Sequence, residues 1–209
     1  MKVLLVNGSS NKNGCTYTAL SEAAKTLNEE GIETEIFQLG NCEIRDCCGC
    51  GACRNGLGKC VFEDGLVNEF IEKAKSSDGF VFGTPVYFAH PSGRILSFLD
   101  RAFYAGGYAF AYKPGAAIAS ARRSGTTASF DVLNKYFTIC NMPVVSSFYW
   151  NNIHGKAAEE AMQDLEGLQT MRTLGRNMAW MLKCIEAGRN NGINKPEQTE
   201  ERIYTNFIR

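Results

Sequence analysis

Short apolar runs alternate along the chain with segments in which apolar residues recur every three or four positions. The first run, VLLV, lies within a predicted strand at Lys2–Asn7, and the pattern becomes helical over residues 16–30. A strand buried on both faces carries a continuous apolar run, whereas an amphipathic helix carries an apolar stripe. The start of the chain is therefore predicted to be a buried strand followed by a helix.

Four later apolar runs predict further strands. These runs lie at residues 34–38, 80–82, 116–121 and 143–145, and amphipathic segments lie at about residues 64–74, 95–103, 130–137 and 168–188. Asp64 is a candidate cap for the first of these segments, and Gly188 is a candidate stop for the last. Five strands that alternate with helices predict an α/β, three-layer αβα sandwich built on a five-stranded parallel sheet.

The chain shows no linker, internal repeat or low-complexity stretch. We therefore expect residues 1–209 to form a single domain, which is an ordinary size for an α/β unit. Two segments stand out within it. One is a Cys-rich loop at about residues 40–60, and the other is a long C-terminal helical region at about residues 156–188.

Composition narrows the range of functions. The 22 basic and 22 acidic residues cancel, so nothing predicts a nucleic-acid partner. The apolar runs are too short to cross a bilayer, and the N-terminus has no signal-peptide pattern, so we expect no membrane partner. The cysteines number nine, which is odd and does not suggest a secreted disulfide framework. A reducing, cytoplasmic location is expected, where clustered cysteines suggest a metal or redox role.

The loop after the first strand, GSSNKNGCT at residues 8–16, is a candidate phosphate site. Small polar residues that lead from a strand into a helix N-terminus favour an anion. The loop lacks the lysine and glycine spacing of a P-loop, and it lacks the G-x-G-x-x-G of a Rossmann fold. A terminal phosphate monoester fits best, although an ordinary turn capped by Asn13 is the alternative. The candidate residues are Ser9, Ser10, Asn11, Asn13, Cys15 and Thr16.

Two further loops follow predicted strands, at residues 84–88 and 120–125. Ligands of open parallel sheets bind beyond the carboxyl ends of the strands, so these loops should meet the phosphate loop there. The first contributes a stiff turn and flat aromatic rings, and the second contributes hydroxyls and two positive charges. The candidate residues are Pro85, Val86, Tyr87, Phe88, Ser120, Arg122, Arg123, Ser124 and Gly125.

These three loops resemble those of NAD(P)H-dependent FMN reductases in the flavodoxin-like superfamily. GSSNKNGCT is similar to the family's GSPRxxxNT-type loop, and GTPVYF at residues 83–88 is similar to its segment beside the flavin. The chain departs from that pattern at Ser10 and Cys15. The resemblance implies a flavodoxin-like fold, bound FMN, and NAD(P)H as co-substrate. It also implies a small electron acceptor (a quinone, flavin, azo or nitro compound) and a homodimer or homotetramer.

No catalytic side chain is expected, because the flavin itself carries the hydride chemistry. One hypothesis concerns Arg122 and Arg123. One of them would stabilise the anionic reduced ring near flavin N1/O2, and the other would meet a nicotinamide nucleotide phosphate. The alternative is that both are solvated loop charges. Asp100, Arg101 and the aromatic residues that follow them are candidate subunit-interface groups.

The cysteine loop carries a second candidate site. Cys47, Cys50, Cys53 and Cys60 form C-x2-C-x2-C-x6-C on a glycine-rich segment, and such thiolates can converge on one cluster or metal ion. Free or structural thiols, a [4Fe–4S] cluster, zinc and a redox disulfide are the interpretations that this pattern leaves open. The pattern resembles the compact motif of iron–sulfur flavoproteins, which implies an electron carrier as the alternative function. A non-enzymatic flavin- or redox-sensing protein is a third hypothesis.

Overall fold

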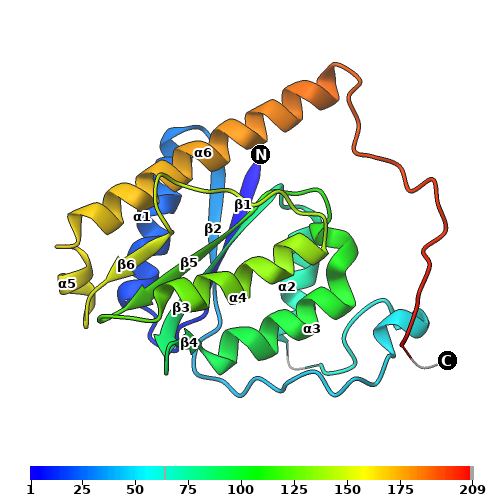
Figure 1. Cartoon of the computed structure of the whole chain (residues 1–209), viewed down its shortest axis with the longest axis horizontal. Coiled ribbons are helices and arrows are strands. Elements are labelled where there is room, and N and C mark those ends of the chain that lie inside the picture. The colour runs from blue at the N-terminus through cyan, green and yellow to red at the C-terminus, as the bar shows by residue number, and fades with distance from the viewer. Residues whose placement is uncertain (64, 208–209) are drawn as a thin grey trace.

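The computed structural model describes residues 1–63 and 65–207. Five parallel strands form the central sheet in the order β2-β1-β3-β5-β6 (Figure 1). They are β1 (Lys2–Asn7), β2 (Glu33–Gln38), β3 (Gly79–Tyr87), β5 (Gly115–Ala121) and β6 (Asn152–His154). The chain runs outward from β1 to β2 and then returns to β3 on the other side of β1. This reversal of direction puts the switch point of the sheet at the carboxyl ends of β1 and β3, where ligands of such sheets bind.

Helices cover both faces of the sheet (Figure 1). On one face lie α1 (Cys15–Glu29), the short α5 (Ala158–Ala161) and the long α6 (Leu165–Asn190). On the other lie α2 (Leu66–Lys75), α3 (Gly93–Phe110) and α4 (Thr126–Ile139). The three-layer α/β sandwich expected from the sequence is therefore confirmed.

Alternation along the strands divides the core between the two faces. Leu4 and Val6 of β1 point toward α2 and α3, whereas Val3 and Leu5 point toward α1 and α6. The α2–α3 side is rich in phenylalanine. The ring of Phe70 lies within 6.4 Å, centroid to centroid, of five other phenylalanine rings: Phe37, Phe80, Phe82, Phe98 and Phe110. This packing fixes α2 and α3 along this face of the sheet.

The fifth strand lies elsewhere than the sequence predicted. Residues 143–145 form a single bridge, Gly115 to Val144, and the fifth strand is β6. Pro143 lacks an N–H donor, which limits pairing there to hydrogen bonds at the first residue of β5. Ile153 is the one apolar side chain of β6, so no apolar run marks this strand. The predicted cap Asp64 lies outside the described residues, and α2 has Gly65 at its N-cap.

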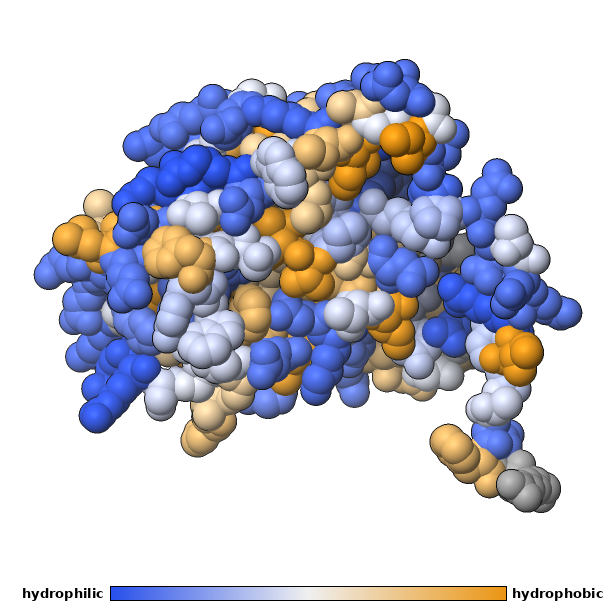
Figure 2. Space-filling model, turned by 45° about the horizontal axis from the view of Figure 1, so that its top comes forward, coloured by the Kyte–Doolittle hydropathy of each residue, from blue (hydrophilic) through white to orange (hydrophobic). Residues whose placement is uncertain are grey.

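The last part of the chain is helical over most of the region that was expected. Helices α5 and α6 cover it, and α6 continues two residues beyond Gly188. Residues 191–207 then leave the body of the molecule as an exposed extended segment (Figures 1 and 2). Figure 2 also shows that hydrophobic residues on the visible face are scattered among hydrophilic ones. Within the described part of the chain, no helix is long and apolar enough to span a bilayer.

Candidate functional site

Three loops interlock at the carboxyl edge of the sheet. The Thr16 hydroxyl, at the start of α1, lies 2.7 Å from the Ser120 hydroxyl at the end of β5. Ser120 Oγ in turn lies 3.5 Å from the carbonyl oxygen of Thr84 on β3. Ser92 Oγ donates to the carbonyl of Gly8 at 3.1 Å. We expected three loops to come together here, and direct contacts join loops 8–16, 84–88 and 120–125.

The phosphate loop is shaped by its own side chains. Asn7 Oδ1 accepts a hydrogen bond from the N–H of Ser9 (3.1 Å), and Ser9 Oγ accepts one from the N–H of Asn11 (3.1 Å). Asn11 Oδ1 then accepts one from the N–H of Asn13 (3.2 Å). Such local bonds replace a regular ladder and hold the loop in one form. Gln38 fastens it to β2 by donating to the Ser9 carbonyl at 2.7 Å.

Gly8 begins this loop because the backbone there passes very close to β3. Its N–H donates to the Gly83 carbonyl at 2.8 Å. A Cβ atom at Gly8 would lie 2.7 Å from that same carbonyl oxygen and 2.7 Å from Ile95 Cδ1. A side chain here would force the loop away from β3.

The N-terminus of α1 faces the phosphate loop. Gly14 is its N-cap, and among the described residues no side chain caps it. The first N–H groups of a helix have no intrahelical partner, so together with the helix dipole they favour an anion here. Ser9 and Thr16 are buried beside this end, whereas Ser10, Asn11 and Asn13 are exposed.

The side chain of Cys15 points away from the loop in which the sequence predicted a phosphate contact. Its thiol donates to the carbonyl of Gly155 at 3.3 Å, on the side of β6. Burial raises the pKa of this thiol above its ordinary value. Its sulfur therefore belongs to the packing between α1 and β6, and what it can offer the loop is its backbone N–H.

The second loop is the turn of a hairpin. Strand β3 continues to Tyr87 and pairs with β4 (His90–Pro91), so that Tyr87 lies opposite His90. Phe88 and Ala89 form the turn with φ of 51° and 59°. Two successive left-handed residues match the twist of a two-residue hairpin but are costly without glycine. Tyr87 and Phe88 are exposed at the tip, and Pro85 and Val86 are half-buried below it.

The third loop packs against this hairpin at Gly125. Its φ is +91°, and a Cβ atom there would lie 2.5 Å from the Cα of Ala89. Glycine is thus required both for the backbone conformation and for the close approach. Within the same loop Ser120 is buried, whereas Arg122, Arg123 and Ser124 are exposed.

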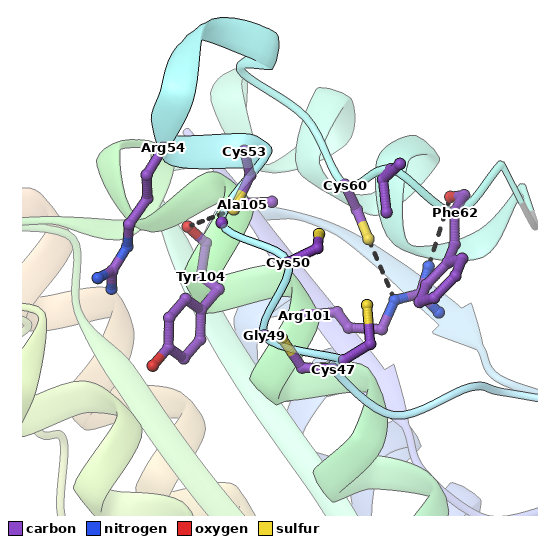
Figure 3. A pocket seen from close by; sticks show the side chains of 13 residues that line it. Cys47, Gly49, Cys50, Cys53, Arg54, Cys60, Phe62, Arg101, Tyr104 and Ala105 are labelled. Carbon is purple, nitrogen blue, oxygen red and sulfur yellow. Dashed lines mark hydrogen bonds between the residues drawn. The ribbon is translucent and has the colours of Figure 1, made fainter.

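The four cysteines of the second candidate site line one cavity of about 200 Å3 (Figure 3). Cys60 is buried, Cys47 and Cys53 are half-buried, and Cys50 is exposed. All are free thiols. The Cys53 thiol lies 3.7 Å from the Tyr104 carbonyl of α3, which holds this side of the loop against the helix. The four cysteines thus lie around the same cavity, and their convergence on one cluster or metal ion stays a prediction.

Arg101 of α3 also reaches this cavity (Figure 3). Its Nε donates to Cys60 Sγ at 3.2 Å, and its side chain is 1 % exposed in relative terms. The suggestion that Arg101 is an interface group was wrong, because it is buried inside its own chain. Its position could have been found from the helix period, since Phe98, Leu99 and Ala102 share its buried side of α3.

The thiols of the cysteine cavity are soft ligands of the kind that iron–sulfur clusters and zinc both use. Among residues 1–63 and 65–207, no three His, Cys, Asp or Glu side chains are arranged around a single ion position. A lone zinc would draw its sulfur ligands to about 2.3 Å from one point. In a [4Fe–4S] cluster each thiolate binds a different iron, so the sulfurs stand around a volume. Five cysteines line the cavity, Cys48 beside the four of the C-x2-C-x2-C-x6-C pattern, so the residue types present fit such a group.

Comparison with known proteins identifies the family. The family model described as NADPH-dependent FMN reductase matches residues 1–157. The chain belongs to this family. An iron–sulfur flavoprotein of Methanocaldococcus jannaschii is 34% identical over 194 residues, which cover 89% of this chain and 100% of that protein. An iron–sulfur flavoprotein of Methanosarcina thermophila is 27% identical over 91% of this chain and 100% of its own.

Solved structures confirm the flavodoxin-like fold of this FMN reductase family member. A flavodoxin from the domain Archaea superposes with a TM-score of 0.61 at 15% identity, over 88% of this chain and 99% of its own. A flavone reductase superposes with a TM-score of 0.67 at 21% identity, over 89% of this chain and 64% of its own. The protein is thus a flavin-based redox protein by family and flavodoxin-like by fold.

Proposed function

We propose that the protein is an FMN- and [4Fe–4S]-containing flavoprotein that passes electrons between the two groups. The observation that carries this proposal is the cavity lined by Cys47, Cys50, Cys53 and Cys60. The same chain also brings loops 8–16, 84–88 and 120–125 together at the carboxyl edge of the sheet, and we call this place the edge site. Its support from the comparisons is that full-length relatives with up to 34% identity are named iron–sulfur flavoproteins. The function that the sequence ranked second is therefore preferred here.

The edge site supplies what FMN needs. Ser9, Thr16 and the free N–H groups at the start of α1 would hold the phosphate, because they offer donors and the positive end of a helix dipole. The hairpin at Tyr87 and loop 120–125 would lie on either side of the ring. FMN supplies the exchange of one or two electrons, and Arg122 or Arg123 would supply positive charge near its N1/O2 edge.

The cysteine cavity supplies four thiolate ligands for a cluster. Cys60 would be the inner ligand, since it is buried against α3 and bonded to Arg101. Cys50 would be the outer one, on the exposed side of the loop. A [4Fe–4S] cluster supplies one-electron transfer.

NAD(P)H-dependent reduction of a small acceptor is the second candidate function, and the matching family model favours it. In that case hydride from the nicotinamide passes to the flavin and then to a quinone, flavin, azo or nitro compound. Ping-pong kinetics would follow if donor and acceptor use one pocket in turn. A flavin-sensing protein without turnover is a third possibility.

An anaerobic visible titration separates these functions. Under the proposed function, NADPH and NADH bleach the flavin slowly, and a reduced low-potential one-electron carrier bleaches it quickly beside broad cluster absorbance. Rapid bleaching by NADPH with no cluster absorbance would establish the reductase instead. A flavin that is reduced neither by NADPH or NADH nor by the one-electron carrier would indicate a flavin-sensing protein.

We also propose that the protein is a cytoplasmic homodimer or homotetramer. The nine free thiols favour a reducing compartment. Exposed aromatic side chains on α3 and α6, namely Tyr104, Tyr108 and Trp180, offer apolar surface for a second subunit. Sedimentation velocity tests this, and a monomer at micromolar concentration with full flavin content would contradict it.

A further inference from the structure

Arg101 stands apart among the charged residues that line the cysteine cavity. It rises from the middle of α3 and is 1 % exposed, whereas Arg54 on the opposite side of the cavity is exposed. Arginine keeps its charge at any pH at which the protein is folded, so Arg101 brings a permanent positive charge into a poorly hydrated place. Burying such a charge is costly unless its donors are satisfied.

The donors of Arg101 are held in a fixed pattern. Nη1 donates to the Arg45 carbonyl at 3.3 Å and Nη2 to the Phe62 carbonyl at 3.4 Å. The guanidinium also lies over the Phe62 ring, 5.1 Å from its centroid. These contacts hold the guanidinium so that Nε donates to Cys60 Sγ, 3.2 Å away (Figure 3). The hydrogen bond from Nε to Cys60 Sγ is thus held in place by carbonyl groups on both sides of residues 47–60, those of Arg45 and Phe62.

We propose that Arg101 sets the reduction potential of the cluster through its bond to the Cys60 sulfur; this inference rests on the proposed function. A cluster held by four thiolates becomes more negative when it takes up an electron. A buried positive charge and an N–H donor on one ligand sulfur stabilise that reduced form. Arg101 is a positioning residue in this account, because it acts on the cluster through Cys60.

The first test compares three variants by anaerobic EPR-monitored titration with dithionite. In Arg101→Gln, the midpoint potential of the assembled cluster falls clearly below that of the wild type. In Arg101→Lys, which keeps the charge but not the planar donor, it falls less. Arg54→Gln is the matched control and shifts the potential less than either, since water screens its exposed charge. The flavin potential, measured in the same titrations, stays unchanged.

Several results would overturn the proposal. If Arg101 is merely structural, Arg101→Gln loses iron in part, but the clusters that remain keep the wild-type potential. If Arg54→Gln and Arg101→Gln shift the cluster potential equally, the shift comes from the loss of a positive charge near the cluster and not from the hydrogen bond to the Cys60 sulfur. If the protein binds no iron at all, the proposed function fails first, and that outcome is read from metal analysis alone.

A second measurement needs no substitution and covers the case in which Arg101→Gln does not fold. The wild-type protein is grown with 15N-arginine, and its cluster is reduced and measured by pulsed EPR. A 15N coupling from an arginine nitrogen is expected, together with an exchangeable proton coupling that disappears in D2O. Absence of the nitrogen coupling in a fully loaded sample would contradict the bond between Nε and the Cys60 sulfur.

Discussion

Thr16 links two of the loops at the carboxyl edge of the sheet. It is buried at the first turn of α1, and its hydroxyl joins the phosphate loop to the end of β5 through Ser120. A hydroxyl in this place can serve the protein scaffold and a bound phosphate at the same time. The sequence identified Thr16 because hydroxyls next to a helix N-terminus are typical of anion sites.

Replacing Thr16 with valine tests that role with little change in shape. Hydrogen bonds to a charged group contribute about 1.5–3 kcal/mol, and about 1.4 kcal/mol corresponds to a tenfold change in affinity. Thr16→Val should therefore raise the FMN dissociation constant about tenfold to a hundredfold. Quenching of flavin fluorescence on binding to the apoprotein measures it. Thr173→Val, on the exposed side of α6, is the control and should leave the constant unchanged.

Single residues could be proposed as site residues where their chemistry was visible locally. Ser9, Thr16 and the four loop cysteines stand in motifs, so their types and spacing alone predict a phosphate site and a cluster or metal site, and both stay predictions. The burial of Arg101 could be found from the helix period, but its partner Cys60 could not, because Cys60 is distant along the chain and comes close only when α3 packs against the cysteine loop. The direction of the Cys15 thiol likewise depends on Gly155, a contact across the fold.

At the scale of elements, the hairpin of β3 and β4 and the start of α4 are joined through Gly125. The substitution Gly125→Ala should destabilise the protein by about 2–4 kcal/mol, since it adds left-handed backbone strain and a clash with Ala89. Gly31→Ala is the matched control. The φ of Gly31 is +82°, but an added Cβ atom would have no neighbour within 4 Å. Gly31→Ala should therefore cost only the backbone strain, about 1–2 kcal/mol, without a clash. Urea unfolding measures both, and equal losses would refute the proposed close packing.

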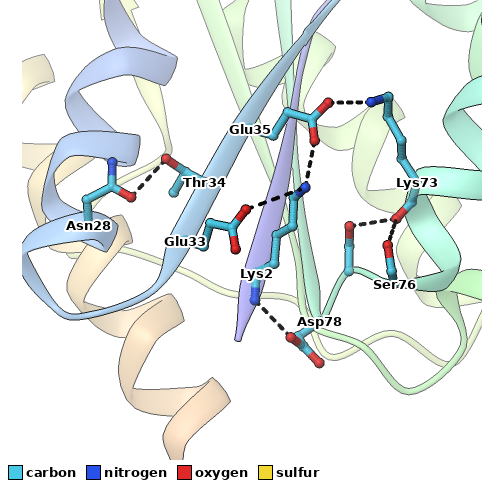
Figure 4. Close-up of polar contacts among 9 residues, drawn as sticks. Lys2, Asn28, Glu33, Thr34, Glu35, Lys73, Ser76 and Asp78 are labelled. Atoms are coloured by element: carbon cyan, nitrogen blue, oxygen red, sulfur yellow. Dashed lines mark hydrogen bonds and ion pairs between the residues drawn. The ribbon is translucent and has the colours of Figure 1, made fainter.

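A charged network ties β1, β2 and α2 together at the other end of the sheet (Figure 4). Glu35 of β2 accepts from Lys2 Nζ at 2.7 Å and lies 2.8 Å from Lys73 Nζ of α2. These two hydrogen bonds lower the pKa of Glu35, although partial burial opposes them. The ionised carboxylate is therefore favoured by folding.

The pH dependence of stability follows from that direction. A carboxyl group with a lowered pKa adds stability above its unfolded pKa of about 4.5, and this gain is lost as pH falls through the lower folded value. Glu35→Gln should cost about 0.5–1.5 kcal/mol at pH 7, and the difference from the wild type should shrink below pH 4.5. Glu69→Gln, a longer and more exposed contact to Lys73, is the control and should cost less. A loss for Glu35→Gln that does not depend on pH would argue against this origin.

Elements were predictable where the hydrophobic period was strong. Continuous apolar runs predicted that β1, β3 and β5 are strands and where they lie. Apolar stripes did the same for the long helices. Strand β6 was missed because it has three residues and one apolar side chain, and its pairing is fixed by β5 rather than by its own sequence. The hairpin turn at Phe88 and Ala89 was equally hidden, since neither residue is one that favours positive φ.

For the whole molecule, the central point is that one chain carries both of the sites that we propose for redox groups. The first lies at the carboxyl edge of the sheet, where the topology brings three loops together. The second lies on the loop between β2 and α2, which packs against α3 through Cys53 and Cys60. The N-cap of α3, Ser92, thus lies beside the first site, and the helix reaches the second site at Arg101 and Tyr104. This helix connects the two sites by packing.

The most direct measurement is iron, acid-labile sulfide and FMN per chain after anaerobic purification. The account predicts about four irons, about four sulfides and about one FMN. Cys60→Ala should keep FMN and lose the iron, whereas Cys184→Ala, at an exposed thiol of α6, should keep both. A protein that holds its full complement of FMN but no iron or sulfide, even without exposure to oxygen, would contradict the account.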